Sequence, residues 1–205
     1  MTQYHKIETL YSRDEKTHKV IPGEWKTQEF EYLEDVDWGW TEKLDGTNVR
    51  VIYDGQGGRS FAGKTDNAQF HPALLAHLQE AIGDSPFGDK PAVLYGEGVG
   101  EKIQGGGDYC EGHQFVLFDV LVNGVWLDRY DVEDVARALR VPAVPFVMMA
   151  KPDGAASHVM SGIASLFAKR APRPMEGLVG RPLVELQDKR GRRIIAKIKT
   201  KDFAR

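Results

Sequence analysis

The sequence predicts an α+β fold in which antiparallel sheets are flanked by helices. Runs with strand character outnumber runs with a helical period along the chain. Tight-turn pairs such as Asp54-Gly55 and Asn123-Gly124 join neighbouring runs into hairpins, and the two strands of a hairpin are antiparallel. The 205 residues, 41% of them hydrophobic and 28% charged, suffice for one globular domain, so we expect a single domain over residues 1–205.

The strands follow from alternation and turn signals. Residues 1–40 are polar and contain the breaker pair Pro22-Gly23, which predicts short strands and loops. The stretch Thr41–Val51 predicts a strand, a tight loop and a second strand, and the next turn leads to a strand at 60–64. The other predicted strands lie at 92–95, 115–122, 125–127 and 146–149 and around Leu178, Val184 and Ile195.

Three segments predict helices that cover a sheet. Residues 72–82 repeat leucine and isoleucine at helical spacing behind a proline, with Gly83 as the C-terminal cap. Asp131 is the expected N-cap of a helix that ends near Leu139. The apolar spacing from Ser157 to Phe167 predicts a third helix.

Composition excludes several classes of protein. No apolar run approaches the roughly 20 residues that cross a bilayer, and residues 1–6 lack the pattern of a signal peptide, so we expect a cytoplasmic protein without a membrane partner. The single cysteine, Cys110, cannot form an intrachain disulfide. The 6 histidines lack zinc-site spacing, which argues against a structural metal.

Charge is unevenly distributed although the net charge is only −3. Residues 24–42 contain seven acidic residues and one basic residue, whereas residues 188–205 contain eight basic and two acidic residues. A cationic end of this kind is typical of a phosphate or nucleic-acid surface, although a solvated charged face is the more common meaning of such a run.

Lys43 is the first candidate for chemistry. It lies between an apolar approach and an alternating run, with Asp45 and Gly46 directly after it. A tight loop here presents an amine beside a carboxylate at the mouth of a β-rich core. This arrangement suits a nucleophilic lysine.

A pair of lysines near the C-terminus is the second candidate for chemistry. Lys197 and Lys199 are two residues apart in a predicted strand, so their side chains share a face. Two adjacent ammonium groups repel each other unless an anion such as a phosphate lies between them. An edge strand that carries lysines against aggregation is the alternative, and by itself the pair favours that alternative.

Two acids and an aromatic residue follow or occupy strands. Glu97 lies between two glycines after a strand, and Glu176 directly precedes Gly177. Each acid could bind a ribose hydroxyl or the water shell of Mg²⁺, or could be an ordinary turn residue. Phe118 precedes Asp119 in a strand; most such phenylalanines are core residues, and a minority stack on a base.

Taken in order, these pieces resemble the covalent nucleotidyltransferase superfamily of ATP-dependent ligases and capping enzymes, over roughly residues 42–203. Lys43-Leu44-Asp45-Gly46 matches the Lys-x-Asp-Gly signature of that superfamily, and Glu42 to Asn48 is similar to its RNA ligase branch. The further matches, in register, are Gly63-Lys64 where most relatives carry arginine, Tyr95-Gly96-Glu97-Gly98, Phe115 to Val120, Glu176-Gly177-Leu178-Val179 and Lys197-Ile198-Lys199.

The resemblance implies an ATP-grasp-like, ligase-type adenylyltransferase domain that uses ATP with Mg²⁺ or Mn²⁺. Lys43 would form a lysyl-AMP intermediate, and the adenylate would pass to a 5′-phosphate end that a 3′-hydroxyl then joins. The resemblance also implies the remaining roles. Nucleotide contacts would come from Glu42, Asn48, Lys64, Glu97 (ribose), Phe118 (adenine), Lys197 and Lys199, and the metal's waters would be bound by Asp45, Glu97 and Glu176.

The resemblance leaves the substrate and the mode of binding open. Many relatives add a C-terminal oligonucleotide-binding barrel or another domain, which this sequence does not show after the fifth motif, so we expect a minimal catalytic domain. Either the basic C-terminal face or an accessory protein would grip the nucleic acid, for which RNA ends are favoured. A DNA ligase, a GTP-using capping-type transferase and a non-catalytic end-binding module are the alternatives.

Overall fold

The computed structural model describes residues 3–203, and these form two compact units. Unit 1 comprises residues 3–5, Leu44–Val144 and Ala168–Ala171. Unit 2 comprises Lys6–Lys43, Pro145–Phe167 and residues 172–203. The chain therefore passes from unit 2 to unit 1 between Lys43 and Leu44, inside the Lys-Leu-Asp-Gly signature.

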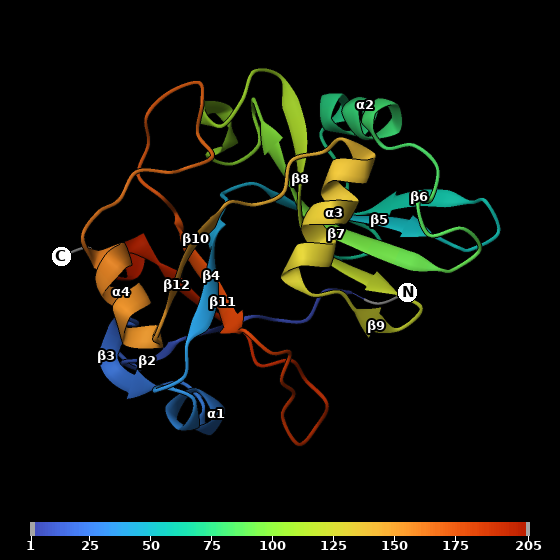
Figure 1. Cartoon of the computed structure of the whole chain (residues 1–205). Coiled ribbons are helices and arrows are strands. Elements are labelled where there is room, and N and C mark those ends of the chain that lie inside the picture. The colour runs from blue at the N-terminus through green and yellow to red at the C-terminus, as the bar shows by residue number, and fades with distance from the viewer. Residues whose placement is uncertain (1–2, 204–205) are drawn as a thin grey trace. The chain divides into compact units, whose positions relative to one another are not determined.

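Unit 1 is an antiparallel sheet covered by helices (Figure 1). Its strand order is β6-β5-β7-β8-β9, and its helices are α2, α3 and the short 3-10 helix η1. The bounds are β5 Thr47–Tyr53, β6 Arg59–Ala62, α2 Pro72–Ala81, β7 Ala92–Gly100, η1 Gly106–Asp108, β8 His113–Val122, β9 Val125–Trp126 and α3 Arg129–Leu139.

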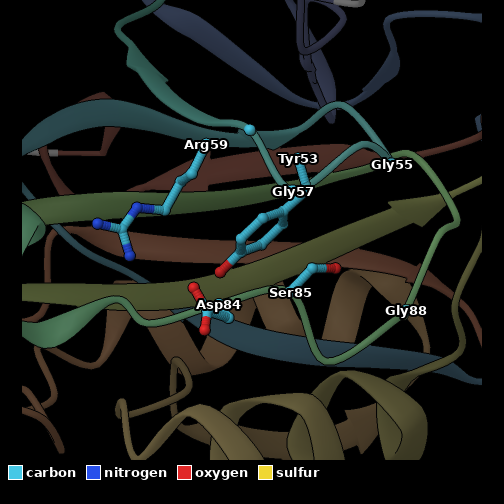
Figure 2. Close-up of a pocket in the computed structure, with 8 residues that line it drawn as sticks. Tyr53, Gly55, Gly57, Arg59, Asp84, Ser85 and Gly88 are labelled. Carbon is cyan, nitrogen blue, oxygen red and sulfur yellow. The ribbon is translucent and has the colours of Figure 1, made fainter.

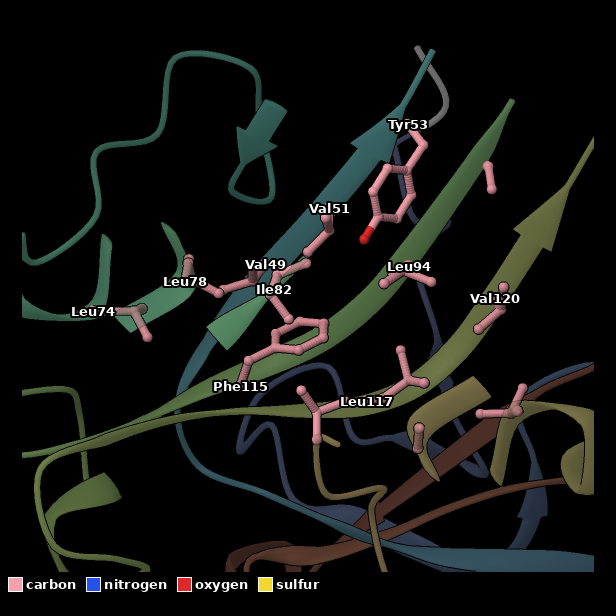
Figure 3. Close-up of a cluster of buried hydrophobic side chains, with 14 of the residues drawn as sticks. Val49, Val51, Tyr53, Leu74, Leu78, Ile82, Leu94, Phe115, Leu117 and Val120 are labelled. Carbon is pink, nitrogen blue, oxygen red and sulfur yellow. The ribbon is translucent and has the colours of Figure 1, made fainter. Parts of the chain in front are cut away.

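The core of unit 1 lies between the sheet and α2 and α3. Alternation in β5 turns Val49 and Val51 to this face, where Leu74 and Leu78 of α2 meet them (Figure 3). All four side chains are fully buried, and burying a side chain of this size contributes roughly 1.5–3 kcal/mol. The opposite face of the sheet is thereby left for other residues, among them Asn48 and Arg50.

Unit 2 contains a five-stranded sheet in the order β1-β12-β11-β4-β10 and a separate hairpin of β2 and β3. β1 is parallel to β12, and the other neighbours are antiparallel. The bounds are β1 Glu8–Thr9, β2 Tyr11–Arg13, β3 Val20–Trp25, α1 Gln28–Tyr32, β4 Trp38–Lys43, β10 Phe146–Ala150, α4 Pro152–Met160, β11 Gly177–Pro182, β12 Ala196–Lys199 and the 3-10 helix η2 Thr200–Asp202.

The core of unit 2 is aromatic. Trp38 and Trp40 are fully buried side chains of β4, and their rings stack with centroids 5.6 Å apart. They pack with Leu178, Ile198 and residues of α4. Because Trp38 and Trp40 face the core, Lys43 faces the other side of the sheet, where its side chain is 24% exposed.

The α+β fold with antiparallel sheets is as predicted, but several element boundaries are not. α3 begins at Arg129, and its N-cap is Asp128, whose carboxylate accepts a hydrogen bond from the N–H of Asp131 at 2.9 Å. Asp131 therefore lies inside the first turn of α3, and the prediction that Asp131 is the N-cap is wrong. α2 ends at Ala81, and Ile82 rather than Gly83 is its C-cap.

Two further predictions are wrong. The third helix runs from Pro152 to Met160 instead of starting at Ser157, because a proline is favourable at the first helical position. Val184 is 71% exposed and lies beyond the end of β11. The short helix α1 in the first forty residues was not expected at all.

Within residues 3–203, no helix has the length and apolar character needed to cross a membrane.

Arg50 is a buried cation on the face of the unit 1 sheet opposite the core. Its side chain is 0% exposed, its Nε donates to the carbonyl of Gly63 at 2.8 Å, and its guanidinium pairs with Asp66 at 2.7 Å. These two bonds fix the loop that carries Lys64 after β6. A buried guanidinium needs such partners, because leaving it unpaired costs several kcal/mol.

We predict that Arg50→Ala lowers the free energy of unfolding by about 3 kcal/mol, because it removes both bonds and leaves a cavity. Chemical denaturation of the purified protein measures the change. Arg137→Ala is the matched control: Arg137 pairs with Asp134 on the surface of α3, and a surface pair contributes about 0–1 kcal/mol. Equal losses in the two variants would contradict the structural role of Arg50.

Candidate nucleotide site

Unit 2 brings three predicted site residues together through strand register. Gly177 of β11 is paired with Lys43 of β4 on one side and with Lys199 of β12 on the other. Glu176, one residue earlier, accepts a hydrogen bond from Nζ of Lys43 at 2.6 Å and one from Nζ of Lys199 at 2.9 Å. One carboxylate therefore bridges two ammonium groups that are far apart in the sequence.

Lys197 adds a third ammonium group to this cluster. It shares the face of β12 with Lys199 and is paired with Val179. Burial lowers the pKa of Lys197, and the charges of Lys199 and Lys43 lower it further. We call Lys43, Glu176, Lys197 and Lys199 the lysine cluster. Its three cations and one carboxylate leave an excess of positive charge on this face of the sheet.

Glu42 is buried and hydrogen-bonded within unit 2. Its side chain is 2% exposed and faces the core side of β4. The carboxylate accepts hydrogen bonds from the hydroxyl of Ser165 and from the backbone N–H groups of Leu166 and Phe167 at 2.9 and 3.0 Å. In this structure Glu42 anchors the segment after α4, and a nucleotide contact by Glu42 stays a prediction.

Unit 1 places Asn48 and Glu97 next to each other. They are paired residues of β5 and β7, on the sheet face opposite the core. Gly46 lies beside them: a Cβ atom there would be 2.3 Å from the carbonyl oxygen of Gly98 and 2.9 Å from Cγ of Glu97. The glycine of the Lys-Leu-Asp-Gly signature is thus required by close packing of the loop against β7.

Tyr109 holds the same loop and was not found from the sequence. Its hydroxyl accepts a hydrogen bond from the backbone N–H of Asp45 at 2.9 Å, and its side chain is fully buried. Tyr109 directly follows η1, in a glycine-rich stretch whose sequence gives no sign of this contact. The backbone next to Lys43 is therefore fixed from a distant part of unit 1.

Phe118 is the extra residue of a β-bulge. Tyr95 of β7 is paired with Asp119 and Gly96 with Leu117, so Phe118 has no partner in that register. Bulges often redirect a side chain near a functional site. The ring of Phe118 is half-buried, and its centroid lies 5.2 Å from that of Tyr4 in an edge-on arrangement. Lys64 is exposed in the loop after β6 that Arg50 fixes.

A small pocket of unit 1 lies elsewhere. It is lined by residues that include Tyr53, Arg59, Asp84 and Ser85, at the end of β5 far from Asn48 (Figure 2). Its volume is about 170 Å³, and ligand pockets typically measure roughly 300–1,000 Å³. None of the predicted site residues lines this pocket, so it does not mark the nucleotide site.

The predicted metal ligands do not form a cluster of acids. Among residues 3–203, no group of three or more histidine, cysteine, aspartate or glutamate side chains is placed to hold a metal ion. Asp45 and Glu97 belong to unit 1, and Glu176 of unit 2 is occupied by two lysines. Mg²⁺ needs only one or two carboxylates besides water and phosphate oxygens, so metal binding by Asp45, Glu97 and Glu176 stays a prediction.

Comparison with known proteins decides the family. Residues 36–199 match the family model described as RNA ligase. The chain belongs to the RNA ligase family. The match includes the lysine cluster and the Asn48–Glu97 pair, so the predicted family is confirmed. Among curated protein sequences, no match to this RNA ligase family member was found.

Solved structures of Naegleria gruberi RNA ligase share its fold. A mutant of that enzyme with ATP and Mn is 21% identical, with a TM-score of 0.61, and the match covers 97% of this chain and 61% of that one. The same ligase with PPi is 21% identical, with a TM-score of 0.58 and coverage of 98% and 62%. The chain described here thus spans about three fifths of the length of these relatives.

We predict that Lys197→Met raises the melting temperature of the ligand-free protein by about 2 °C, because one of three adjacent cations is removed. A lowered pKa means that folding disfavours the charged form, so the gain is present at pH 7 and fades as the pH rises through that pKa. Thermal unfolding over a pH series measures it.

The same substitution is expected to weaken binding of inorganic tripolyphosphate about 10-fold, since an anion loses one cationic partner. Lys189→Met, which removes an exposed lysine of unit 2, is the matched control and should change neither quantity. A lower melting temperature for Lys197→Met would show that the lysines do not repel one another.

Proposed function

We propose that this protein is an ATP-dependent RNA ligase whose nucleophile is Lys43. The observation that carries the proposal is the lysine cluster on a chain of the RNA ligase family. Glu176 lies 2.6 Å from the Lys43 amine and can take its proton, which leaves a neutral nucleophile. The Lys43 nitrogen then bonds to the α-phosphorus of ATP as the bond to pyrophosphate breaks.

The rest of the reaction transfers the adenylate and seals the ends. The phosphate of a 5′-phosphate RNA end takes AMP from Lys43, which regenerates the amine. The 3′-hydroxyl of the other end then loses its proton and attacks the activated 5′-phosphate, and AMP leaves. Lys197 and Lys199 neutralise phosphate charge in these steps, since cations at a transferring phosphate stabilise developing charge.

The nucleoside is assigned to residues of unit 1. Asn48 and Glu97 are adjacent on one sheet face and suit a ribose, and Phe118 offers an aromatic ring for adenine. Lys64 is exposed, so its ammonium group is accessible to a bound nucleotide. Mg²⁺ or Mn²⁺, held through Asp45, Glu97 and Glu176, would supply charge neutralisation when bound.

Solved structures of a relative support the use of ATP and the release of pyrophosphate. Solved forms of the Naegleria ligase are described with ATP and Mn, and another form with PPi, the leaving group of the first step. A DNA ligase, a GTP-using capping-type transferase and a non-catalytic end-binding module remain alternatives that the experiments below separate. An accessory clamping protein has no support from the comparisons and stays a prediction, as does a cytoplasmic location.

We predict that the wild-type protein becomes covalently labelled when it is incubated with Mg²⁺ and α-labelled ATP and then denatured. Lys43→Ala should lose the label entirely, because the phosphoramidate has no other attachment point. Lys151→Ala, which removes an exposed lysine of unit 2, is the matched control and should keep it. Label only from GTP would favour a capping-type enzyme, and label on Lys43→Ala would identify another nucleophile.

A second prediction concerns the substrate. Equal amounts of protein are incubated with one of three substrates: nicked duplex RNA, nicked duplex DNA or single-stranded RNA. Each substrate has 5′-phosphate and 3′-hydroxyl ends, and the joined product is measured on a denaturing gel. We expect RNA ends to be joined at least 10-fold faster than DNA ends. Equal or faster joining of DNA would replace the RNA ligase proposal with a DNA ligase. Lys43→Ala serves as the blank.

A further inference from the structure

The segment of residues 3–5 lies on the unit 1 sheet face that carries Phe118. Tyr4 makes the contacts: its hydroxyl donates to Oδ2 of Asp119 at 2.8 Å. Its ring lies 5.0 Å from that of Tyr95, 5.2 Å from that of Phe118 and 5.8 Å from that of Trp126. Tyr4 therefore contacts residues of three strands of the sheet, β7, β8 and β9.

The bulge in β8 explains why Tyr4 reaches both Phe118 and Asp119. Neighbouring residues of a regular strand point to opposite faces. Phe118 is the extra residue in the register between β7 and β8, which breaks this alternation and brings its ring and the Asp119 carboxylate to one tyrosine. The Asp119 side chain is 1% exposed, so the bond to Tyr4 satisfies a buried acceptor.

We propose that Tyr4 is a positioning residue for the nucleobase: it fixes the ring of Phe118 for stacking on a purine. This inference rests on the proposed function, in which Phe118 contacts adenine. Edge-on aromatic pairs are favourable, and a ring that is already held loses less conformational entropy when a base binds. The hydroxyl bond to Asp119 sets where the Tyr4 ring lies, so the acid acts through the tyrosine.

The position of Tyr4 predicts which part of the nucleotide it affects. Tyr4 contacts Phe118, Asp119, Tyr95, Trp126 and its neighbour His5, and Phe118 is the residue proposed to contact the base, whereas the phosphates are assigned to the lysine cluster. Substitution should therefore weaken recognition of the base and leave recognition of the phosphates unchanged. A general folding defect would weaken both.

The test compares Tyr4→Ala and Tyr4→Phe with wild type in the self-labelling reaction over a range of ATP concentrations. Tyr4→Ala should raise the KM for ATP, the concentration that gives half the maximal labelling rate, about 10-fold and leave the maximal labelling rate within about 2-fold, because the ring support is lost. Tyr4→Phe keeps the ring and should raise the KM only about 2-fold. Tyr130→Ala removes a tyrosine that is 79% exposed on α3 and should match wild type.

A raised KM could come from weaker recognition of the base or from a general folding defect. Inhibition by inorganic tripolyphosphate separates these two explanations. This probe has phosphates and no base, so its inhibition constant should be the same in wild type and Tyr4→Ala. A parallel rise of that constant, an unchanged KM in Tyr4→Ala, or a KM that falls because residues 3–5 compete with ATP would each overturn the inference. Absence of label in wild type would instead overturn the proposed function.

Discussion

The pairing of β11 between β4 and β12 is the constraint on which the lysine cluster depends. Antiparallel register sets Gly177 opposite both Lys43 and Lys199, and it leaves Glu176 at the strand end within reach of both amines. A shift by one residue would turn each lysine to the tryptophan core, where an unpaired ammonium costs many times the energy of a surface charge. The aromatic core thus fixes the register of the charged face.

Electrostatics explain why Glu176 belongs to this face. Two unit charges 4 Å apart interact by about 4 kcal/mol at the effective dielectric constant near a protein surface, so three clustered cations would be costly alone. Glu176 offsets part of the repulsion, and burial together with the charges of Lys199 and Lys43 lowers the pKa of Lys197. In the proposed reaction, an incoming phosphate would supply negative charge to the lysine cluster and release the carboxylate for the proton of Lys43. The ligand-free protein already carries an excess of positive charge on this face.

The sequence predicted the fold class from local patterns, and it identified Lys43, Glu176, Lys197 and Lys199 as candidate site residues through the resemblance to the ligase signatures. Alternation in β12 identified Lys197 and Lys199, and turn chemistry identified the hairpins. Long-range contacts left no such trace: Tyr4 and Asp119 are separated by 115 residues, and Asp45 and Tyr109 by 64. The burial of Glu42 was not predicted, although alternation in β4 places its side chain on the same face as Trp38 and Trp40.

The glycines and the charged residues of the signatures have different physical causes. A Cβ atom on Gly46 or Gly177 would lie 2.3 or 2.0 Å from a backbone carbonyl oxygen, so packing alone requires both glycines. Packing does not require the lysines: an uncharged side chain at positions 43, 197 and 199 would relieve repulsion and keep the strands. A protein that only preserved the fold would retain the glycines and could lose the cluster. The proposed function therefore rests on the lysines and Glu176, because packing of the strands does not account for them.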